Sequence, residues 1–301
     1  MLEERALPSW YKFRIAVDAL FKDKQKRKRN REEHFSSHRP DVKSMLRFDL
    51  HPGSRLLFRG QKNADWKLRS TWDREYPVST CSLKNLFQFV EHTIQQLPAH
   101  LVPSFENIDE GDYPICLTDF RMWRATERWP HSRFDSMTLL RHMGALSPLL
   151  DWSRSPYVAA YFAVSDASPD QKEDVAVFHI QEERNNMKRT NVNGTCIHTL
   201  DSSGRSHERQ IRQQSEYTFC VRSSANPAGC LQVCSHQDYF DNSDSEQHQL
   251  ERLIKFTIPI ADRATALLEL ERMNITEASL FGTDDSLART VFRRTVMLMN
   301  Q

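Results

Sequence analysis

Residues 149–163 have the sequence LLDWSRSPYVAAYFA, in which a short apolar run leads through two serines into an alanine-rich segment. The apolar run predicts a buried strand. Ser155 followed by Pro156 is a favoured pair for the N-cap and first turn of a helix, so a helix is predicted over residues 157–167. Backbone N–H groups at a helix start attract phosphate or hydroxyl oxygens, so this unit is a candidate ligand cradle. An ordinary helix cap without a ligand is the more common use of the same pattern.

The rest of the chain shows both strand and helix periodicities. Short apolar or alternating runs predict further strands at 54–61, 174–180, 216–224 and 250–260. Apolar residues at helical spacing predict helices at 9–21, 83–97, 115–129, 263–274 and 286–299. The polar stretch 235–250 is predicted to be a surface insertion. Strands and helices in this order predict an α+β fold, with several helices packed against a split β-sheet.

Composition limits the class of protein. The 301 residues carry 41 Lys and Arg against 40 Asp and Glu, which excludes a uniformly basic nucleic-acid coat protein but allows a local charged patch. No window of roughly 18 residues is continuously apolar, and the acidic N-terminus lacks the pattern of a signal peptide. The six scattered cysteines are expected to be reduced thiols. Together these features predict a cytoplasmic protein without a membrane span.

Several kinds of catalytic site are absent from the sequence. There is no glycine-rich phosphate loop, no HExxH zinc motif and no Gly-x-Ser-x-Gly nucleophile turn. Cys230, Cys234 and His236 lie close together but lack a second pair of residues at zinc-ligand spacing. Any catalysis is therefore expected to use arginine, serine, histidine and carboxylate side chains without a metal ion.

Arg59 is a second candidate site residue, because it ends the apolar run 54–61 just before a glycine. A guanidinium in such a place is costly unless it meets a carboxylate or a phosphate, although a surface arginine at a strand exit is the simpler interpretation. Asp151 could supply the carboxylate to Arg59 or to Arg141, and the sequence does not choose between them. His142, near Gly144 at the end of a segment, could be a core or capping histidine, or it could act as a base or contact a substrate.

The N-terminal helix runs into a strongly basic segment. Seven of the ten residues from Lys22 to Arg31 are Lys or Arg. This segment could be a solvated helix end, contact the phosphates of RNA or DNA, or bind an acidic partner protein. The neighbouring Trp10, Tyr11 and Phe13 could stack on bases or pack into the core. We expect an N-terminal helix and basic arm at residues 1–46, a main domain at 47–292 and a tail at 293–301.

These motifs together resemble the FRG domain, a family named for its Phe-Arg-Gly sequence. The resemblance covers residues 50–292 and includes Phe58-Arg59-Gly60, Arg141-His142-x-Gly144 and the stretch 149–163. Further matching positions are Gln61, Trp66, Leu68, the run 175–178, Gln213-Gln214-Ser215-x-Tyr217-Thr218 and Ala278-Ser279-Leu280-Phe281. This chain departs from the family at Ser147-Pro148, where Thr-Arg is usual and would add a cation near the site.

The same layout resembles the Arg-Ser-Glu class of ADP-ribosyltransferases. These enzymes carry an arginine on a first strand, a Ser-Thr-Ser strand end before a helix, and a glutamate on a later strand. Arg59, Ser153-Arg154-Ser155 and Gln214-Ser215-Glu216 occupy the three places in that order, although the central threonine of the middle place is missing. The resemblance implies the split mixed β-sheet of ADP-ribosyltransferases and the activity of a mono-ADP-ribosyltransferase with NAD as substrate.

The resemblance also implies roles for individual residues. Arg59 would bind the pyrophosphate of NAD, Ser153 would hold the nicotinamide ribose, and Glu216 would stabilise the transition state through the ribose 2′-hydroxyl. These three are the implied catalytic residues. The implied NAD contacts are Arg59, Gly60, His142, Ser153, Ser155, Tyr161 and Gln214.

An FRG domain with this activity would suit a toxin in bacterial anti-phage defence that an antitoxin protein holds silent. Lys22–Arg31 would bring a nucleic acid, RNA in preference to DNA, to the site, and a protein acceptor is the alternative. Two other functions stay open. One is a non-catalytic module that binds a nucleotide or phosphate, and the other is an NAD glycohydrolase, in which water replaces the acceptor.

Overall fold

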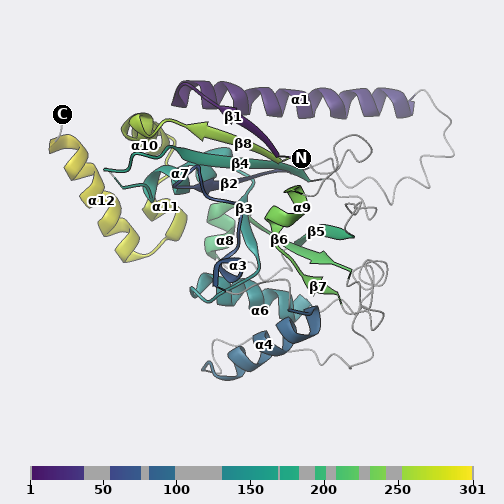
Figure 1. Ribbon diagram of the computed structural model, residues 1–301. Helices are drawn as coiled ribbons and strands as arrows, with labels where there is room; N and C mark the ends of the chain where they lie inside the picture. The colour runs from purple at the N-terminus through teal and green to yellow at the C-terminus, as the bar shows by residue number, and fades with distance from the viewer. Residues whose placement is uncertain are drawn as a thin grey trace.

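The fold is built on one mixed β-sheet of eight strands (Figure 1). The computed structural model describes residues 2–36, 55–75, 81–98, 131–168, 170–182, 194–200, 208–223, 231–241 and 253–299. The strands are β1 (Leu2–Ala6), β2 (Arg55–Gln61), β3 (Leu150–Ser153), β4 (Val175–Glu182), β5 (Thr195–Leu200), β6 (Ser215–Arg222), β7 (Gln232–Val233) and β8 (Leu253–Ile258). Their order is β1-β8-β4-β2-β3-β6-β5, and β7 also pairs with β6. Among these described strands, β1 and β8 run parallel and the other pairs are antiparallel.

Helices pack around this sheet, which confirms the α+β class. They are α1 (Trp10–Ser36), α3 (Thr71–Glu75), α4 (Leu83–Gln95), α6 (His131–His142), α7 (Pro156–Ser165), α8 (Glu208–Gln213), α9 (His236–Asp241), α10 (Arg263–Arg272), α11 (Glu277–Phe281) and α12 (Asp284–Met299), with a short 3₁₀ turn, η5, at Ile260–Asp262. One buried cluster joins α1, α7 and α10 to β2, β4 and β8. A second joins α4 and α6 to β5 and β6.

The sheet is narrow at its centre. β2 pairs with β4 along its whole length, from Arg55 to Gln61, but meets β3 in register only where Phe58 lies opposite Ser153. In Figure 1 the strands on the β4 side run across the upper part of the view, whereas β5, β6 and β7 run obliquely below them. The split sheet expected from the sequence is thus one connected sheet, in which β2 and β3 share a single register pair.

The strand–turn–helix unit at 149–163 forms as predicted. β3 ends at Ser153, and Ser155 caps α7 by accepting a hydrogen bond from the Val158 N–H (3.3 Å). Gly60 of β2 lies directly under α7. A β-carbon at this position would be 2.0 Å from the Ala159 carbonyl oxygen and 2.7 Å from the Ala163 nitrogen. Glycine is therefore required here so that α7 can pack closely on β2.

The N-terminal helix continues beyond its predicted end at residue 21 to Ser36, so the basic segment is helical. Trp10 and Phe13 are buried, and Phe13 packs edge-on against Phe256 of β8 (ring centroids 6.0 Å apart). Tyr11 is 61% exposed. Core packing therefore accounts for Trp10 and Phe13. Within the described residues, no helix has the length and apolar character needed to cross a membrane.

Some elements differ from those predicted. The sequence did not indicate β1, β5 or β7. β1 has the charged sequence LEERA, and it forms because its backbone pairs with β8 from the far end of the chain. The surface insertion predicted at 235–250 is wrong at its start, since α9 buries His236, Gln237, Tyr239 and Phe240. The helix predicted at 115–129 and residues 242–250 lie outside the described residues.

Candidate functional site

Arg59 and Arg141 converge on the carboxylate of Asp151. Arg59 belongs to β2, Asp151 to β3 and Arg141 to the last turn of α6. The Nη1 of Arg59 donates to the Asp151 backbone carbonyl (2.8 Å) and pairs with its Oδ2 (3.1 Å). Arg141 donates to Oδ1 through Nε (3.1 Å) and Nη2 (2.6 Å), and its Nη1 donates to the Thr71 hydroxyl (2.9 Å). The sequence left open which arginine Asp151 meets, and the structure brings it to both.

Burial and charge act in opposite directions on this cluster. The Arg59 side chain is only 10% exposed. Burial lowers the pKa of Arg59, while the Asp151 carboxylate opposes that change. Burial alone would raise the pKa of Asp151, but the guanidinium groups of Arg59 and Arg141 together outweigh it and hold that pKa well below its usual range. Two cations facing one carboxylate leave a net positive charge, which suits an anionic ligand.

His142 and Tyr217 lie beside this cluster. The Tyr217 hydroxyl is 2.6 Å from Nε2 of His142, and Tyr217 on β6 is the register partner of Asp151 on β3. Burial, followed by the negative charge of Asp151, raises the pKa of Tyr217 to about 12. The phenol therefore stays protonated at neutral pH. The structure thus brings His142, a predicted NAD contact, close to Asp151 through Tyr217, which the sequence indicated as a family position but not as a site residue.

Ser153 and Ser155 bind partners within the protein. The Ser153 hydroxyl donates to the Gln213 carbonyl (2.8 Å) and accepts from the Ser155 N–H (3.0 Å). Ser155 is the N-cap of α7, which is the ordinary use of this sequence pattern. The two hydroxyls hold the end of β3 against the end of α8 and direct the chain into α7.

Glu216 is buried on β6 and lies directly opposite Trp152 of β3. Its Oε1 accepts a hydrogen bond from Nη1 of Arg55 (2.6 Å) and lies 3.8 Å from Nε of Arg154. Arg55 and Arg59 are on the same strand, β2. Within the described residues, Arg59 and Glu216 share no hydrogen bond or ion pair, so two separate arginine–carboxylate clusters flank the junction of β2, β3 and β6.

The other three predicted NAD contacts have different surroundings. Gly60 faces α7, as described above. Tyr161 is buried on α7, where its hydroxyl accepts a hydrogen bond from Arg293 of α12 (2.7 Å). Gln214 has a left-handed backbone (φ 50°), and its carbonyl accepts from the Arg154 N–H (3.0 Å). In the described part of the chain, none of these three residues forms a hydrogen bond with Arg59, Arg141 or Asp151.

His236 is a residue of this region that the sequence did not connect with Arg59. The indole N–H of Trp152 donates to the Thr218 hydroxyl (2.7 Å), which lies 2.8 Å from Nε2 of His236. Because an indole only donates, and because the described residues offer the hydroxyl proton no other acceptor, we assign that proton to Nε2 and the ring proton to Nδ1. Burial, with a contribution from Arg59, lowers the pKa of His236 to about 3, so the ring is neutral.

Two buried donors in this region have no partner. They are the Nε–H of Arg59 and, with the tautomer assigned above, the Nδ1–H of His236. Arg59 binds Asp151 of β3, and the next residue of that strand, Trp152, is connected to His236 through the Thr218 hydroxyl. Buried donors without acceptors are rare in folded proteins. Each of these N–H groups can therefore donate a hydrogen bond to an oxygen of a ligand, such as a phosphate or carbonyl oxygen.

No metal site is evident in the described part of the chain, where no three His, Cys, Asp or Glu residues cluster. Cys234, one member of the weak zinc pattern, instead lies beside Cys220, with the two sulfur atoms 3.0 Å apart. Cys230 lies outside the described residues.

Comparison with known proteins supports the first resemblance. Residues 54–172 match the FRG domain. This range contains Arg59, Arg141, Asp151, Ser153 and Ser155, while Glu216 lies beyond it. The chain thus carries an FRG domain over less than half of its length. No curated protein and no solved structure matches the chain significantly.

Proposed function

We propose that this protein is a mono-ADP-ribosyltransferase that uses NAD as its substrate. The observation that carries the proposal is that Arg59, Ser153 and Glu216 stand on β2, β3 and β6, which are neighbours in the sheet. Phe58 pairs with Ser153 and Trp152 with Glu216, so the three residues stand at similar levels across the sheet. An arginine, a serine and a glutamate on adjacent strands are what the resemblance to ADP-ribosyltransferases implies.

In the proposed reaction the bond between nicotinamide and its ribose breaks, and nicotinamide leaves as a neutral base with the bonding electrons. An oxygen or nitrogen of the acceptor forms the new bond to the same ribose carbon and gives up its proton. Arg59 would bind the pyrophosphate with its unpartnered Nε–H. Glu216 would bind the ribose 2′-hydroxyl and stabilise the positive charge of the transition state. Ser153 would be a positioning residue, because its hydroxyl already binds Gln213 and Ser155.

For the acceptor we propose a nucleic acid, with RNA favoured over DNA and over a protein. Lys22, Lys26 and Arg29 are exposed on α1, and no acidic residue occurs between Lys24 and Arg31. Figure 1 shows this end of α1 extending beyond the sheet. Phosphate contacts made by such a segment weaken steeply as salt increases. A toxin of this kind in anti-phage defence would also need an antitoxin protein that keeps it silent.

A second function is favoured by the ion pairs of the two carboxylates. Asp151 is held by two arginines, and Glu216 is held by Arg55. A domain that only binds a nucleotide or a phosphorylated ligand would use Arg59 and Arg141 in the same way and would leave Glu216 as a structural ion-pair partner. This alternative predicts ligand binding without any consumption of NAD.

The test is an incubation with NAD labelled on its adenylate, together with RNA, DNA and lysate proteins. Arg59→Lys and Glu216→Gln are compared with the wild type, and Arg5→Lys on β1 serves as a control. We expect label on one class of acceptor, with a rate about 10²–10³-fold lower in Glu216→Gln and unchanged in the control. Free ADP-ribose without labelled acceptor would identify a glycohydrolase. Binding of NAD without any consumption of it would show that the protein is the non-catalytic binding module.

A further inference from the structure

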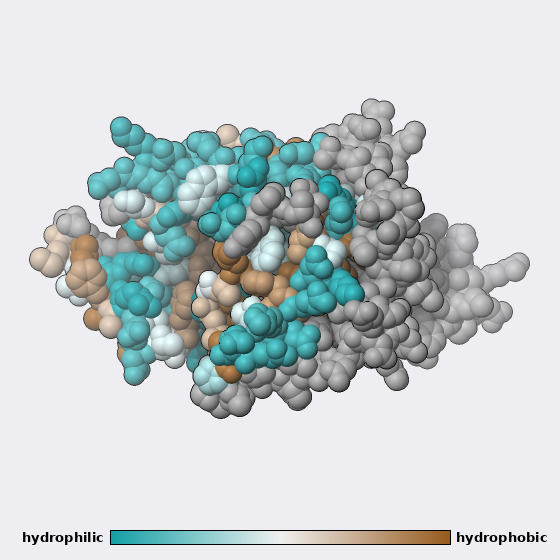
Figure 2. Space-filling view, turned by 60° about the horizontal axis from the view of Figure 1, so that its bottom comes forward, coloured by the Kyte–Doolittle hydropathy of each residue, from teal (hydrophilic) through white to brown (hydrophobic). Residues whose placement is uncertain are grey.

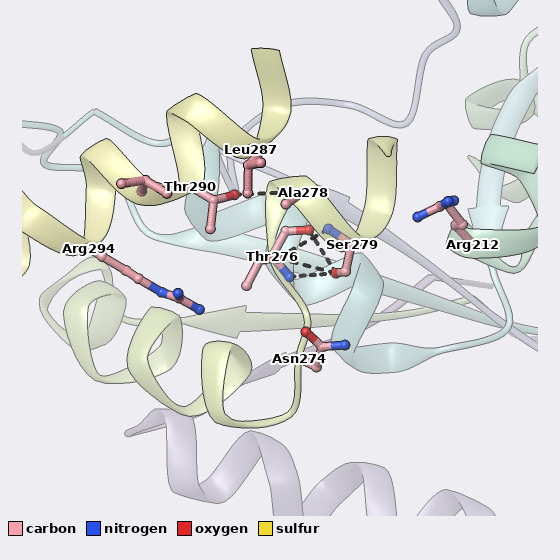
Figure 3. Close-up of a pocket in the computed structure, with 9 residues that line it drawn as sticks. Arg212, Asn274, Thr276, Ala278, Ser279, Leu287, Thr290 and Arg294 are labelled. Carbon is pink, nitrogen blue, oxygen red and sulfur yellow. Dashed lines mark hydrogen bonds between the residues drawn. The ribbon is translucent and has the colours of Figure 1, made fainter. Parts of the chain in front are cut away.

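The surface beside α12 carries charges that the chain itself neutralises. Apolar atoms reach the surface there, at the left edge of Figure 2, next to a hollow of about 530 Å³. Figure 3 shows Arg212 and Arg294 at the two ends of this hollow, and each of them pairs with a glutamate of the same chain. The hydroxyls of Thr276, Ser279 and Thr290 in its wall form hydrogen bonds within α11, its cap and α12. The described residues that line the hollow therefore indicate no ligand, and a better defined feature lies in the interior.

Cys220 and Cys234 form a pair of buried thiols. Cys220 lies on β6 and Cys234 directly follows β7, and their sulfur atoms are 3.0 Å apart. Both are free cysteines, and their exposed fractions are only 0% and 3%. A disulfide bond joins two sulfur atoms about 2.05 Å apart, so these two would need to approach each other by about 1 Å.

The backbone around the two thiols already has the geometry that a disulfide requires. β7 pairs with the end of β6 in antiparallel register, where Val221 lies opposite Val233. Cys220 and Cys234 continue this register by one position, and the Cys234 N–H donates to the Cys220 carbonyl (3.0 Å). Residues directly opposite each other in antiparallel strands have Cα atoms roughly 4.5–5.5 Å apart, which lies within the span of about 4.4–6.8 Å that a disulfide bridges. The bond can therefore form by rotation of the side chains, without displacement of the strands.

The same register connects the thiol pair with the candidate site. Two positions further on, it brings His236 opposite Thr218, and Nε2 of His236 lies 2.8 Å from the Thr218 hydroxyl. That hydroxyl accepts the indole N–H of Trp152 on β3. β3 pairs with β6 only as far as Thr218, and β7 pairs with the end of β6, so Cys220 lies where one neighbouring strand replaces the other. A bond between Cys220 and Cys234 would therefore fix the start of α9, with His236, on β6.

We propose that Cys220 and Cys234 are a redox-active dithiol, whose reversible disulfide clamps the start of α9 to β6. The oxidant is a small-molecule disulfide such as oxidised glutathione. The thiolate of one cysteine attacks this disulfide and releases one glutathione, and the sulfur of the other cysteine then displaces the second glutathione from the mixed disulfide. The two protein thiols thereby lose two electrons and two protons, and the glutathione disulfide takes them up as two glutathione thiols. The proposal does not depend on the enzymatic activity proposed above.

Burial of the pair makes this exchange slow. Burial raises the pKa of Cys220 well above its ordinary value, so this thiol is protonated at neutral pH. Only a thiolate attacks a disulfide, so the reaction needs local opening of the chain near β7. Oxidation is therefore expected to take about hours, as uncatalysed disulfide exchange does. A pair of this kind responds to sustained oxidation and not to a brief pulse of oxidant.

The test incubates the full chain overnight with oxidised or with reduced glutathione and then digests it with trypsin without reduction. Cys220 lies in the tryptic peptide 213–222, and Cys234 lies in the peptide 223–252. Mass spectrometry should find the two peptides joined by a disulfide after oxidation and separate after reduction. Because the second peptide also contains Cys230, two variants decide which cysteine forms the bond. Cys230→Ala should keep the joined peptides, and Cys234→Ala should lose them.

The disulfide should also stabilise the fold, because it restricts the unfolded chain between two residues that are 14 positions apart. The midpoint of thermal unfolding should be about 5 °C higher for the oxidised than for the reduced wild type. The difference should vanish in Cys220→Ala and in Cys234→Ala. It should persist in the control Cys196→Ala, since Cys196 is equally buried but packs in the cluster of α4 and α6, apart from the pair. Each protein is compared with itself in two redox states, so a loss of stability caused by the substitution alone does not affect the result.

Amide hydrogen exchange across residues 231–241 tests the clamp on α9. Exchange in this segment should slow when the wild type is oxidised and should not change in Cys234→Ala. The proposal is overturned if oxidation joins no peptides, if the joined peptides persist in Cys234→Ala, or if they are lost in Cys230→Ala. Equal unfolding midpoints, or equal exchange across 231–241, in the oxidised and reduced wild type would also overturn it.

Discussion

Replacing Asp151 by asparagine removes the negative charge between Arg59 and Arg141. The asparagine oxygen can still accept from Arg141, but its amide group would face Arg59 in place of Oδ2, which is now 3.1 Å from Nη1. A hydrogen bond to a charged group contributes about 1.5–3 kcal/mol when buried. The Asp151 side chain is 45% exposed, so we take the lower end of this range, about 1.5 kcal/mol, for its contact with each of the two arginines. The hydrogen bond from Arg141 to the asparagine oxygen would survive, and we subtract about 1 kcal/mol for it. The expected loss is about 2 kcal/mol.

The stabilisation by Asp151 depends on pH in a direction that follows from its lowered pKa. The pKa of Asp151 is lowered in the folded protein, so the unfolded chain takes up the proton first as the pH falls. The stabilisation by Asp151 is therefore complete above pH about 4, the ordinary pKa of aspartate, and is lost as the pH falls further toward the lowered value. The stability difference between wild type and variant should be constant from pH 7 to pH 5 and should shrink below pH about 4.

The assay is urea unfolding of wild type, Asp151→Asn and the control Asp65→Asn, whose side chain lies at an exposed position. At neutral pH the free energy of unfolding of Asp151→Asn should be about 2 kcal/mol lower than that of the wild type. In a separate thermal unfolding experiment, its midpoint should be about 4 °C lower. The control should match the wild type. Equal stability of Asp151→Asn and wild type at pH 7 would refute the reasoning, and so would a difference that grows as the pH falls.

Three further predictions concern single residues. Gly60→Ala would place a carbon 2.0 Å from the Ala159 carbonyl oxygen; we expect a loss of at least about 3 kcal/mol in urea unfolding, and a stable variant would contradict the close packing of α7. Ser155→Ala removes the hydroxyl that caps α7 and should cost about 1 kcal/mol in thermal unfolding, whereas Ser155→Asp should retain most of the stability. Tyr217→Phe should remove one late-titrating phenol from an ultraviolet pH titration, because burial raises the pKa of Tyr217 to about 12; loss of a phenol that titrates near pH 10 would argue against that burial.

The sequence predicted the centre of the fold better than its edges. β3, the cap at Ser155 and α7 depend on local patterns, namely an apolar run, a capping serine and a proline at the first helical position. β1 has no such pattern, because its backbone is ordered by β8, about 250 residues away. β5 (TCIHTL) is wholly buried although polar residues interrupt its apolar run, so local alternation did not reveal it.

The candidate site could be predicted only in part for the same reason. Arg59 and Asp151 were found because an arginine within an apolar strand needs an anionic partner. Arg55 and His236 could not be found in this way, since Arg55 binds Glu216, 161 residues further along the chain, and His236 of α9 binds Thr218 of β6. The pairing of β2, β3 and β6 brings Arg55 to Glu216, and the packing of α9 on β6 brings His236 to Thr218; no local spacing encodes either contact.

The most direct test of the proposed activity compares NAD binding and nicotinamide release in wild type and Glu216→Gln. Binding is measured by equilibrium dialysis with labelled NAD, and release by chromatography. We expect both proteins to bind NAD with similar affinity and the variant to release nicotinamide about 10²–10³-fold more slowly. Equal rates of release in the two proteins, or an absence of NAD binding to the wild type, would contradict the assignment of Glu216 as the catalytic carboxylate of an ADP-ribosyltransferase.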